Sequence, residues 1–177
     1  MGKLNQIDKA AESKGSLLVT IWQFVKFIVV SLLAMIVQFV LLNTLNLIPA
    51  IKALNDQPFE WWVFIYPVAV GGLGYFIVSN VANIVAQIVA FFVNKEKTFN
   101  SGANVAVALP IYIVFTIALI LFSAWLNPTL KEVFIGWNLE EVAAKNIATM
   151  ICSAMQFFLY FPVDKILFHK KKEEKAE

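Results

Sequence analysis

The chain has 177 residues, of which 60% are hydrophobic, and its 14 basic and 12 acidic residues leave a formal net charge of +2. That apolar content is well above the roughly half found in soluble globular domains, and it lies in long runs, so we predict an all-α integral membrane protein. All basic residues are lysines and the only cysteine is Cys152. This composition excludes bidentate arginine sites and an internal disulfide. We expect no metal, no cofactor and no nucleic-acid partner.

Four transmembrane helices are predicted within one membrane domain that covers 22–168. A polar cytoplasmic arm at 1–21 precedes this domain, and a charged cytoplasmic tail at 169–177 follows it. The spans are expected at about 22–48, 73–93, 105–126 and 146–165.

The second apolar stretch, from 61 to 93, is too long for one straight span. Its 33 residues would form a helix of about 50 Å, against a hydrocarbon core of ~30 Å. Pro67 and the glycines of 71–74 predict a break, because proline and clustered glycines interrupt a helix. We therefore interpret 61–70 as interfacial or re-entrant.

The lysines predict the orientation of the spans. Eleven of them fall on one side: Lys3, Lys9, Lys14, Lys26, Lys95, Lys97, Lys165, Lys170, Lys171, Lys172 and Lys175. Only Lys52, Lys131 and Lys145 fall on the other side. Because cytoplasmic loops of membrane proteins carry the excess of lysine, both termini and the middle loop are expected in the cytoplasm of a multi-pass plasma-membrane protein.

Polar residues recur at three- and four-residue steps along the spans, so each span has a polar stripe on one helical face. The third span contributes Tyr112, Thr116 and Ser123. Lipid cannot satisfy such groups, and the stripes should therefore face one another or a wet groove. Two interpretations remain open: hydrogen bonds between helices, or a path for a hydroxyl-rich headgroup. The candidate path residues are Gln38, Asn80, Asn83, Gln87, Gln156 and Tyr160.

One motif closes the second span and returns in weaker form 70 positions later. The first copy lies at 91–99 and reads Phe-Phe-Val-Asn-Lys-Glu-Lys-Thr-Phe; the second lies at 161–168 and reads Phe-Pro-Val-Asp-Lys-Ile-Leu-Phe. Two apolar helices that end in the same basic signature suggest two repeated helical hairpins, with both lysines at one membrane face.

Lys26, Lys95 and Lys165 lie at the predicted cytoplasmic ends of spans one, two and four. They are either snorkelling lysines or a cationic pocket for a phosphate at the headgroup level. In the second interpretation Asn94 donates to the phosphate and Asp164 orients a lysine. The chain has no nucleophile elbow, no Walker loop and no zinc-binding helix, so we expect a protein that is not an enzyme.

The four spans and the residues Phe91, Asn94, Lys95 and Phe99 resemble the GtrA-like family of small four-helix membrane proteins, in which a Phe-x-x-Asn-[Arg/Lys]-x-x-x-Phe pattern closes the second span. The resemblance implies that the protein translocates a polyprenyl-phosphate-linked monosaccharide from the inner to the outer leaflet, for glycosylation of cell-surface polysaccharide or teichoic acid. It also implies a membrane glycosyltransferase of the same pathway as a partner.

A groove in one chain, or the interface of a homodimer, would shield the headgroup while the prenyl tail stays in the bilayer. The alternative is a non-transporting membrane anchor, or partner subunit, of a polyprenyl-phosphate glycosyltransferase. A small four-helix drug exporter is disfavoured, because the spans contain no embedded glutamate.

Overall fold

The computed structural model describes residues 3–169, apart from several side chains near 3–5 and 141–149. Its elements in chain order are α1 (Lys3–Glu12), α2 (Ser16–Leu45), α3 (Pro49–Lys52), β1 (Phe59–Trp61), β2 (Phe64–Tyr66), η1 (Val68–Val70), α4 (Gly72–Val93), η2 (Asn94–Thr98), α5 (Val105–Gly136) and α6 (Glu141–Leu167). In this described part, α2, α4, α5 and α6 are long and apolar enough to cross a membrane. The predicted helical, multi-pass membrane protein is confirmed in that form. The predicted tail, His169 aside, lies outside the described residues.

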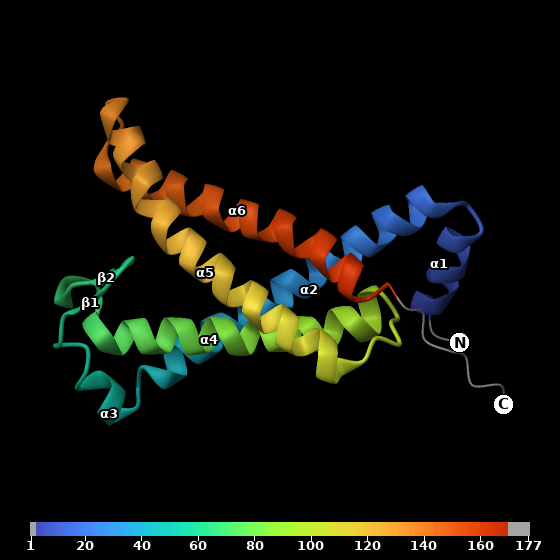
Figure 1. Cartoon of the computed structure of the whole chain (residues 1–177), viewed down its shortest axis with the longest axis horizontal. Coiled ribbons are helices and arrows are strands. Elements are labelled where there is room, and N and C mark those ends of the chain that lie inside the picture. Colours follow the sequence, from blue (N-terminus) through green and yellow to red (C-terminus); the bar gives the residue numbers. More distant parts are fainter. Residues whose placement is uncertain (1–2, 170–177) are drawn as a thin grey trace.

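The four long helices form two pairs. α2 packs along α4, and α5 packs along α6. The pairs meet where α4 and α6 end, and they diverge toward the opposite end, where α5 turns into α6 (Figure 1). The start of α2 lies at the meeting end as well, because Lys165 on α6 donates a hydrogen bond to Thr20 on α2.

Small side chains bring α2 and α4 together. Ala82, Ala86 and Ala90 recur every fourth residue on α4 and are at most 5% exposed. Ala86 and Ala90 pack against Val30 and Ala34 of α2. A stripe of alanines lets two backbones approach closely, which is how helices associate in lipid. The remaining large apolar side chains of α2 are mostly exposed, as expected for a face that contacts lipid.

The break predicted in the second apolar stretch is confirmed. Pro67 precedes the short helical turn η1, Gly71 adopts a left-handed φ of 100°, and α4 begins at Gly72. The segment before the break contains a small antiparallel hairpin of β1 and β2, with Trp61 opposite Phe64. The sequence analysis did not predict these strands. Aromatic side chains favour strands, and here they pack onto Phe76 at the start of α4.

α5 is longer than the span predicted at 105–126. It continues through Pro128 to Gly136, a total of 32 residues. At 1.5 Å per residue this helix is about 48 Å long, more than the ~30 Å of a hydrocarbon core. The helix is therefore longer than one untilted crossing of the hydrocarbon core requires.

Candidate functional site

The motif that closes α4 forms a turn of π-helix, η2. The backbone N–H of Phe99 donates to the carbonyl oxygen of Asn94 at 2.9 Å, a bond that spans five residues. This wider turn directs Asn94, Lys95 and Thr98 inward, and all three are buried. The π-helix is rare, and single π-turns in α-helices frequently lie at functional sites. The candidate site therefore begins where α4 ends.

Asn94 joins the two copies of the motif. Its Nδ2 donates to Oδ2 of Asp164 at 2.7 Å, and its Oδ1 accepts from Oγ1 of Thr98 at 2.8 Å. Asn94 and Asp164 are 1% and 0% exposed. In the structure the Asn94 amide therefore binds Asp164. The partner of Asp164 is this asparagine and not the lysine that we expected.

The phenylalanines of the two copies contact one another reciprocally. Phe91, which opens the first copy, lies 5.1 Å from Phe168, which closes the second, measured between ring centroids. Phe161, which opens the second copy, lies 6.2 Å from Phe99, which closes the first. The start of each copy therefore packs against the end of the other copy. We call the cluster of Phe91, Asn94, Phe99, Phe161, Asp164 and Phe168 the motif junction.

Lys95 folds back against the loop that follows η2. Its Nζ donates to the carbonyl oxygen of Ser101 at 3.0 Å and lies 3.3 Å from Oε1 of Glu96. The lysine is 8% exposed, whereas Glu96 is exposed. The cation is therefore held beneath the surface with one carboxylate at its outer side.

The other two predicted lysines lie at the same end of the bundle with different partners. Lys26 forms an ion pair of 2.9 Å with Asp8 of α1, which also accepts from Nε1 of Trp22. Lys165 is exposed, although it donates to Thr20 on α2 at 2.7 Å. Lys165 is thus less buried than Lys95, its counterpart in the first copy.

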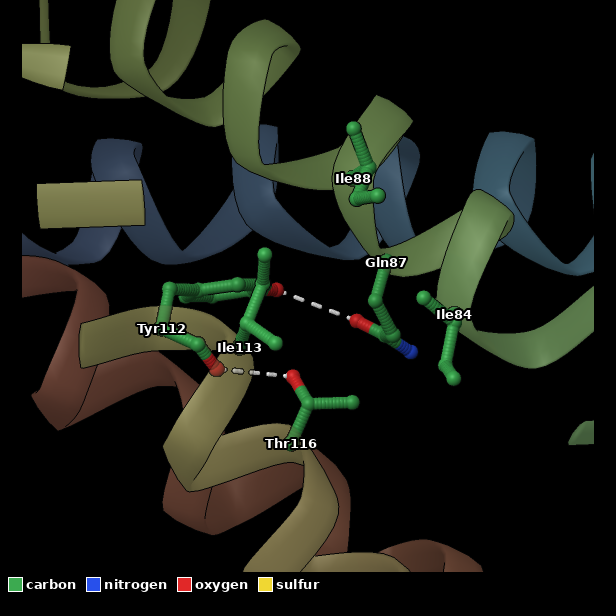
Figure 2. Close-up of a pocket in the computed structure, with 6 residues that line it drawn as sticks. All are labelled: Ile84, Gln87, Ile88, Tyr112, Ile113 and Thr116. Carbon is green, nitrogen blue, oxygen red and sulfur yellow. Dashed lines mark hydrogen bonds between the residues drawn. The ribbon is translucent and has the colours of Figure 1, made fainter. Parts of the chain in front are cut away.

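A chain of hydrogen bonds connects α4, α5 and α6. Its members on α4 and α6 precede the motif junction along each helix. Tyr160 on α6 donates to Oγ1 of Thr116 on α5, which donates to the carbonyl oxygen of Tyr112. The Tyr112 hydroxyl donates to Oε1 of Gln87 on α4 at 3.0 Å (Figure 2). We call Gln87, Tyr112, Thr116 and Tyr160 the polar chain. The prediction that polar stripes face one another is confirmed here.

The remaining predicted path residues are placed differently. Gln156 donates to Ser123, a second bond between α6 and α5. Asn80 donates to the carbonyl oxygen of Phe76 on its own helix. Asn83 and Gln38 are half-buried on α4 and α2. The structure therefore gathers Gln87, Gln156 and Tyr160 between helices, while Asn80 bonds within α4.

The space beside the polar chain is small. A cavity of about 10 Å³ lies between α4 and α5, lined by Gln87, Tyr112 and Thr116 with apolar neighbours. Such a volume holds about one water molecule. A larger, open groove of about 300 Å³ lies between α1 and the start of α2, and Trp22 and Lys14 contribute to its lining.

Sequence reasoning missed several groups that complete the site. Asp8 and Thr20 carried no signal, because only the fold brings α1 and α6 to α2. Thr98 and Ser101, 1% and 0% exposed, are buried by the π-turn and the following loop. Tyr112 and Thr116 were placed on one face of the third span, and this four-residue spacing is the signal that identifies them as partners of α4 and α6.

These features define a small multi-pass membrane protein with a buried polar cluster where its two helix pairs meet and further hydrogen bonds between its helices. A scan against protein-family models and searches of curated proteins and solved structures find no match to the chain.

Proposed function

We propose that this protein translocates a polyprenyl-phosphate-linked monosaccharide across the plasma membrane, from the cytoplasmic to the outer leaflet. One observation carries the proposal: α4 and α6 each carry polar groups between the helices and further buried polar groups at the end that bears the lysines. Gln87 lies two turns before Asn94 on α4, about 10 Å along the axis. On α6, Gln156, Tyr160 and Asp164 follow one another at four-residue steps, which places them on one face.

The lysines at this end are suited to bind the lipid phosphate. Lys26 and Lys95 each hold a carboxylate, that of Asp8 and that of Glu96. In the proposal, the carboxylates of Asp8 and Glu96 occupy the positions where phosphate oxygens would bind. Lysine binds phosphate as a point charge. In the proposed mechanism the phosphate replaces these carboxylates. The exposed Lys165 adds a third cation at the same end of the helices.

The polar chain would receive the sugar. Sugar hydroxyls both donate and accept hydrogen bonds, as do the amide of Gln87 and the hydroxyls of Tyr112 and Thr116. The cavity beside them is about 10 Å³, too small for a sugar, so the proposal treats this structure as a closed state. Passage requires the α2–α4 pair to separate from the α5–α6 pair, while the prenyl tail remains in lipid.

The proposal includes membership of the GtrA-like family and an origin by duplication of one helical hairpin. The reciprocal phenylalanine contacts and the Asn94–Asp164 bond support the duplication. Cytoplasmic termini are supported by the lysine distribution and by the bond that places the start of α2 beside the end of α6. A membrane glycosyltransferase would supply the lipid-linked sugar, and a homodimer is an alternative enclosure for the headgroup.

Lys95→Gln tests the phosphate site in cells. Glutamine removes the charge and keeps a donor for the Ser101 carbonyl oxygen, so the loop is expected to fold. Cells that express the variant at the wild-type level should lose sugar decoration of the surface glycan. Lys97→Gln, at an exposed lysine two residues away, should leave decoration intact. Undiminished decoration with Lys95→Gln would refute the phosphate site.

A second candidate function is that of an anchor or partner subunit for the glycosyltransferase. The small cavity and the partnered Lys26 and Lys95 favour it, because a packed bundle is what an anchor needs. Deleting α1 and exchanging the middle loop should then abolish co-purification of the glycosyltransferase. Co-purification that survives both changes would count against the anchor.

A further inference from the structure

Asp164 is a buried carboxyl group that the proposed phosphate and sugar contacts do not use. It lies in α6 within the segment long and apolar enough to span the membrane, and none of its surface is exposed. Oδ2 accepts one hydrogen bond, from the neutral amide of Asn94. Oδ1 is buried and has no hydrogen-bond partner among the described residues.

The charged groups around Asp164 are engaged elsewhere. On η2, Lys95 donates to Ser101 and pairs with Glu96. Lys165 on α6 donates to Thr20, and Lys26 on α2 pairs with Asp8.

The titratable neighbours on α5 and α6 are the hydroxyls of Tyr112 and Tyr160, which donate to Gln87 and Thr116. Within residues 3–169, none of these cations forms an ion pair with Asp164.

A carboxylate in this setting would be a buried charge with one amide donor and no counter-ion. Desolvation of an unpaired charge costs more than a single hydrogen bond returns. The neutral acid leaves only a hydroxyl without a partner, which is a far smaller penalty. From this geometry we infer that Asp164 is a proton-binding site that closes the motif junction when occupied and opens it when the proton leaves.

The direction of the effect follows from linkage. The closed junction excludes water and favours the neutral acid, whereas an open junction hydrates the carboxylate and favours the ionised form. Raising the pH therefore shifts the population toward the open form. On opening, the O–H bond of the acid breaks, its proton passes to cytoplasmic water and the electron pair stays on the carboxylate. The inference deepens the proposed function by making transport dependent on proton binding.

Two measurements on the full chain in lipid nanodiscs test the inference without any transport. The first is infrared spectroscopy of protein with isotope-labelled aspartate. The sequence contains only Asp8, Asp56 and Asp164, so Asp8→Asn with Asp56→Asn leaves Asp164 as the sole labelled group. We expect a protonated carboxyl band at neutral pH that disappears on alkaline titration. A fully ionised Asp164 at neutral pH would overturn the inference.

The second measurement is the distance between spin labels on cysteines at Lys97 and Ile166, two exposed positions beside the junction, in a Cys152→Ser background. The distance should increase with pH in the otherwise wild-type protein and in Glu60→Gln, which removes an exposed carboxyl group away from the junction. Asp164→Asn, which mimics the neutral acid, should keep the short distance at every pH. A pH-dependent distance in Asp164→Asn, or a distance that responds to sodium and not to pH, would refute the inference. Because neither readout requires a sugar lipid, they can succeed even if the transport proposal fails.

Discussion

Asn94 and Asp164 hold the same position in two copies of one motif, and the amide nitrogen of Asn94 donates to the carboxyl oxygen of Asp164 at 2.7 Å. Asn94 directly follows α4 and Asp164 lies on α6, so the two residues belong to different helix pairs. The bond therefore joins the end of α4 to the end of α6, at the point where the two pairs meet. Any separation of the pairs at this end must break it.

Replacing Asn94 with alanine should destabilise the protein. The change leaves Asp164 and Thr98 without their partner in a buried setting, and each unsatisfied polar group costs about 1–3 kcal/mol. We expect a loss of about 2 kcal/mol or more, seen as a lower thermal unfolding midpoint in detergent. Asn43→Ala is the matched control, since Asn43 is exposed and bonds only to its own helix. Equal midpoints for the two variants would contradict the role given to the Asn94–Asp164 bond.

Gly72 should tolerate no side chain. Its φ is +51°, and an added Cβ would collide with the carbonyl oxygen of Gln57. A non-glycine residue in the left-handed region costs of order 1–3 kcal/mol, and the collision adds to this. Gly72→Ala should thus lower the free energy of unfolding by about 2 kcal/mol or more. Gly136→Ala, where an added Cβ meets nothing within 4 Å, should have no such effect. A neutral Gly72→Ala would show that the start of α4 is not packed against this loop.

Asp8→Ala should strengthen binding of polyprenyl phosphate. It removes the carboxylate that pairs with Lys26, whose side chain is 11% exposed, while that of Asp8 is 33% exposed. A partly exposed ion pair is worth up to about 1 kcal/mol, so affinity should rise by as much as about fivefold. Titration of the purified protein in detergent, followed by Trp22 fluorescence, measures the gain in variants that lack the other tryptophans. Lys26→Ala combined with Asp8→Ala should cancel it. An unchanged affinity in Asp8→Ala would exclude Lys26 from the phosphate site.

Tyr112→Phe separates a path from simple helix packing. The change deletes the hydroxyl that donates to Gln87 and keeps the aromatic ring. Interhelical hydrogen bonds in membrane proteins average about 0.6 kcal/mol, so stability should fall only slightly. If the polar chain carries the sugar, the rate of translocation should fall strongly although the free energy of unfolding changes little. Tyr75→Phe, at an exposed tyrosine on α4, is the control. Normal transport in Tyr112→Phe would assign the polar chain to packing alone.

The sequence was sufficient to predict the membrane helices because their signal is local. Long apolar runs locate α2, α4, α5 and α6, and Pro67 with the following glycines locates the break before α4. The length of α5 was not predictable in the same way, since Pro128 usually ends a helix in sequence-based reasoning. Outside the hydrocarbon core, water can satisfy the carbonyl group that a proline leaves unpaired. The small hairpin at 59–66 depends on packing against Phe76, a tertiary contact.

The candidate site was predictable only as a list of residue types. The motif identified Asn94, Lys95, Asp164 and Lys165 as important, and helical spacing identified Gln87, Gln156 and Tyr160. The pairing between them depends on how the helices cross, and spacing within one helix says nothing about that crossing. For this reason Asp164 was expected beside a lysine, whereas the structure places it against Asn94. The partners Asp8 and Thr20 depend on long-range packing in the same way.

The most direct test of the central claim is translocation by the purified protein alone. Vesicles that contain the protein and a polyprenyl-phosphate sugar with a radiolabel would be exposed to a membrane-impermeant enzyme that modifies only outward-facing sugar. With the wild-type protein, essentially all of the lipid should become modified, whereas vesicles with Lys95→Gln should stop at the fraction that faced outward initially. If wild-type vesicles stop at the same fraction as protein-free vesicles, the protein does not translocate this lipid.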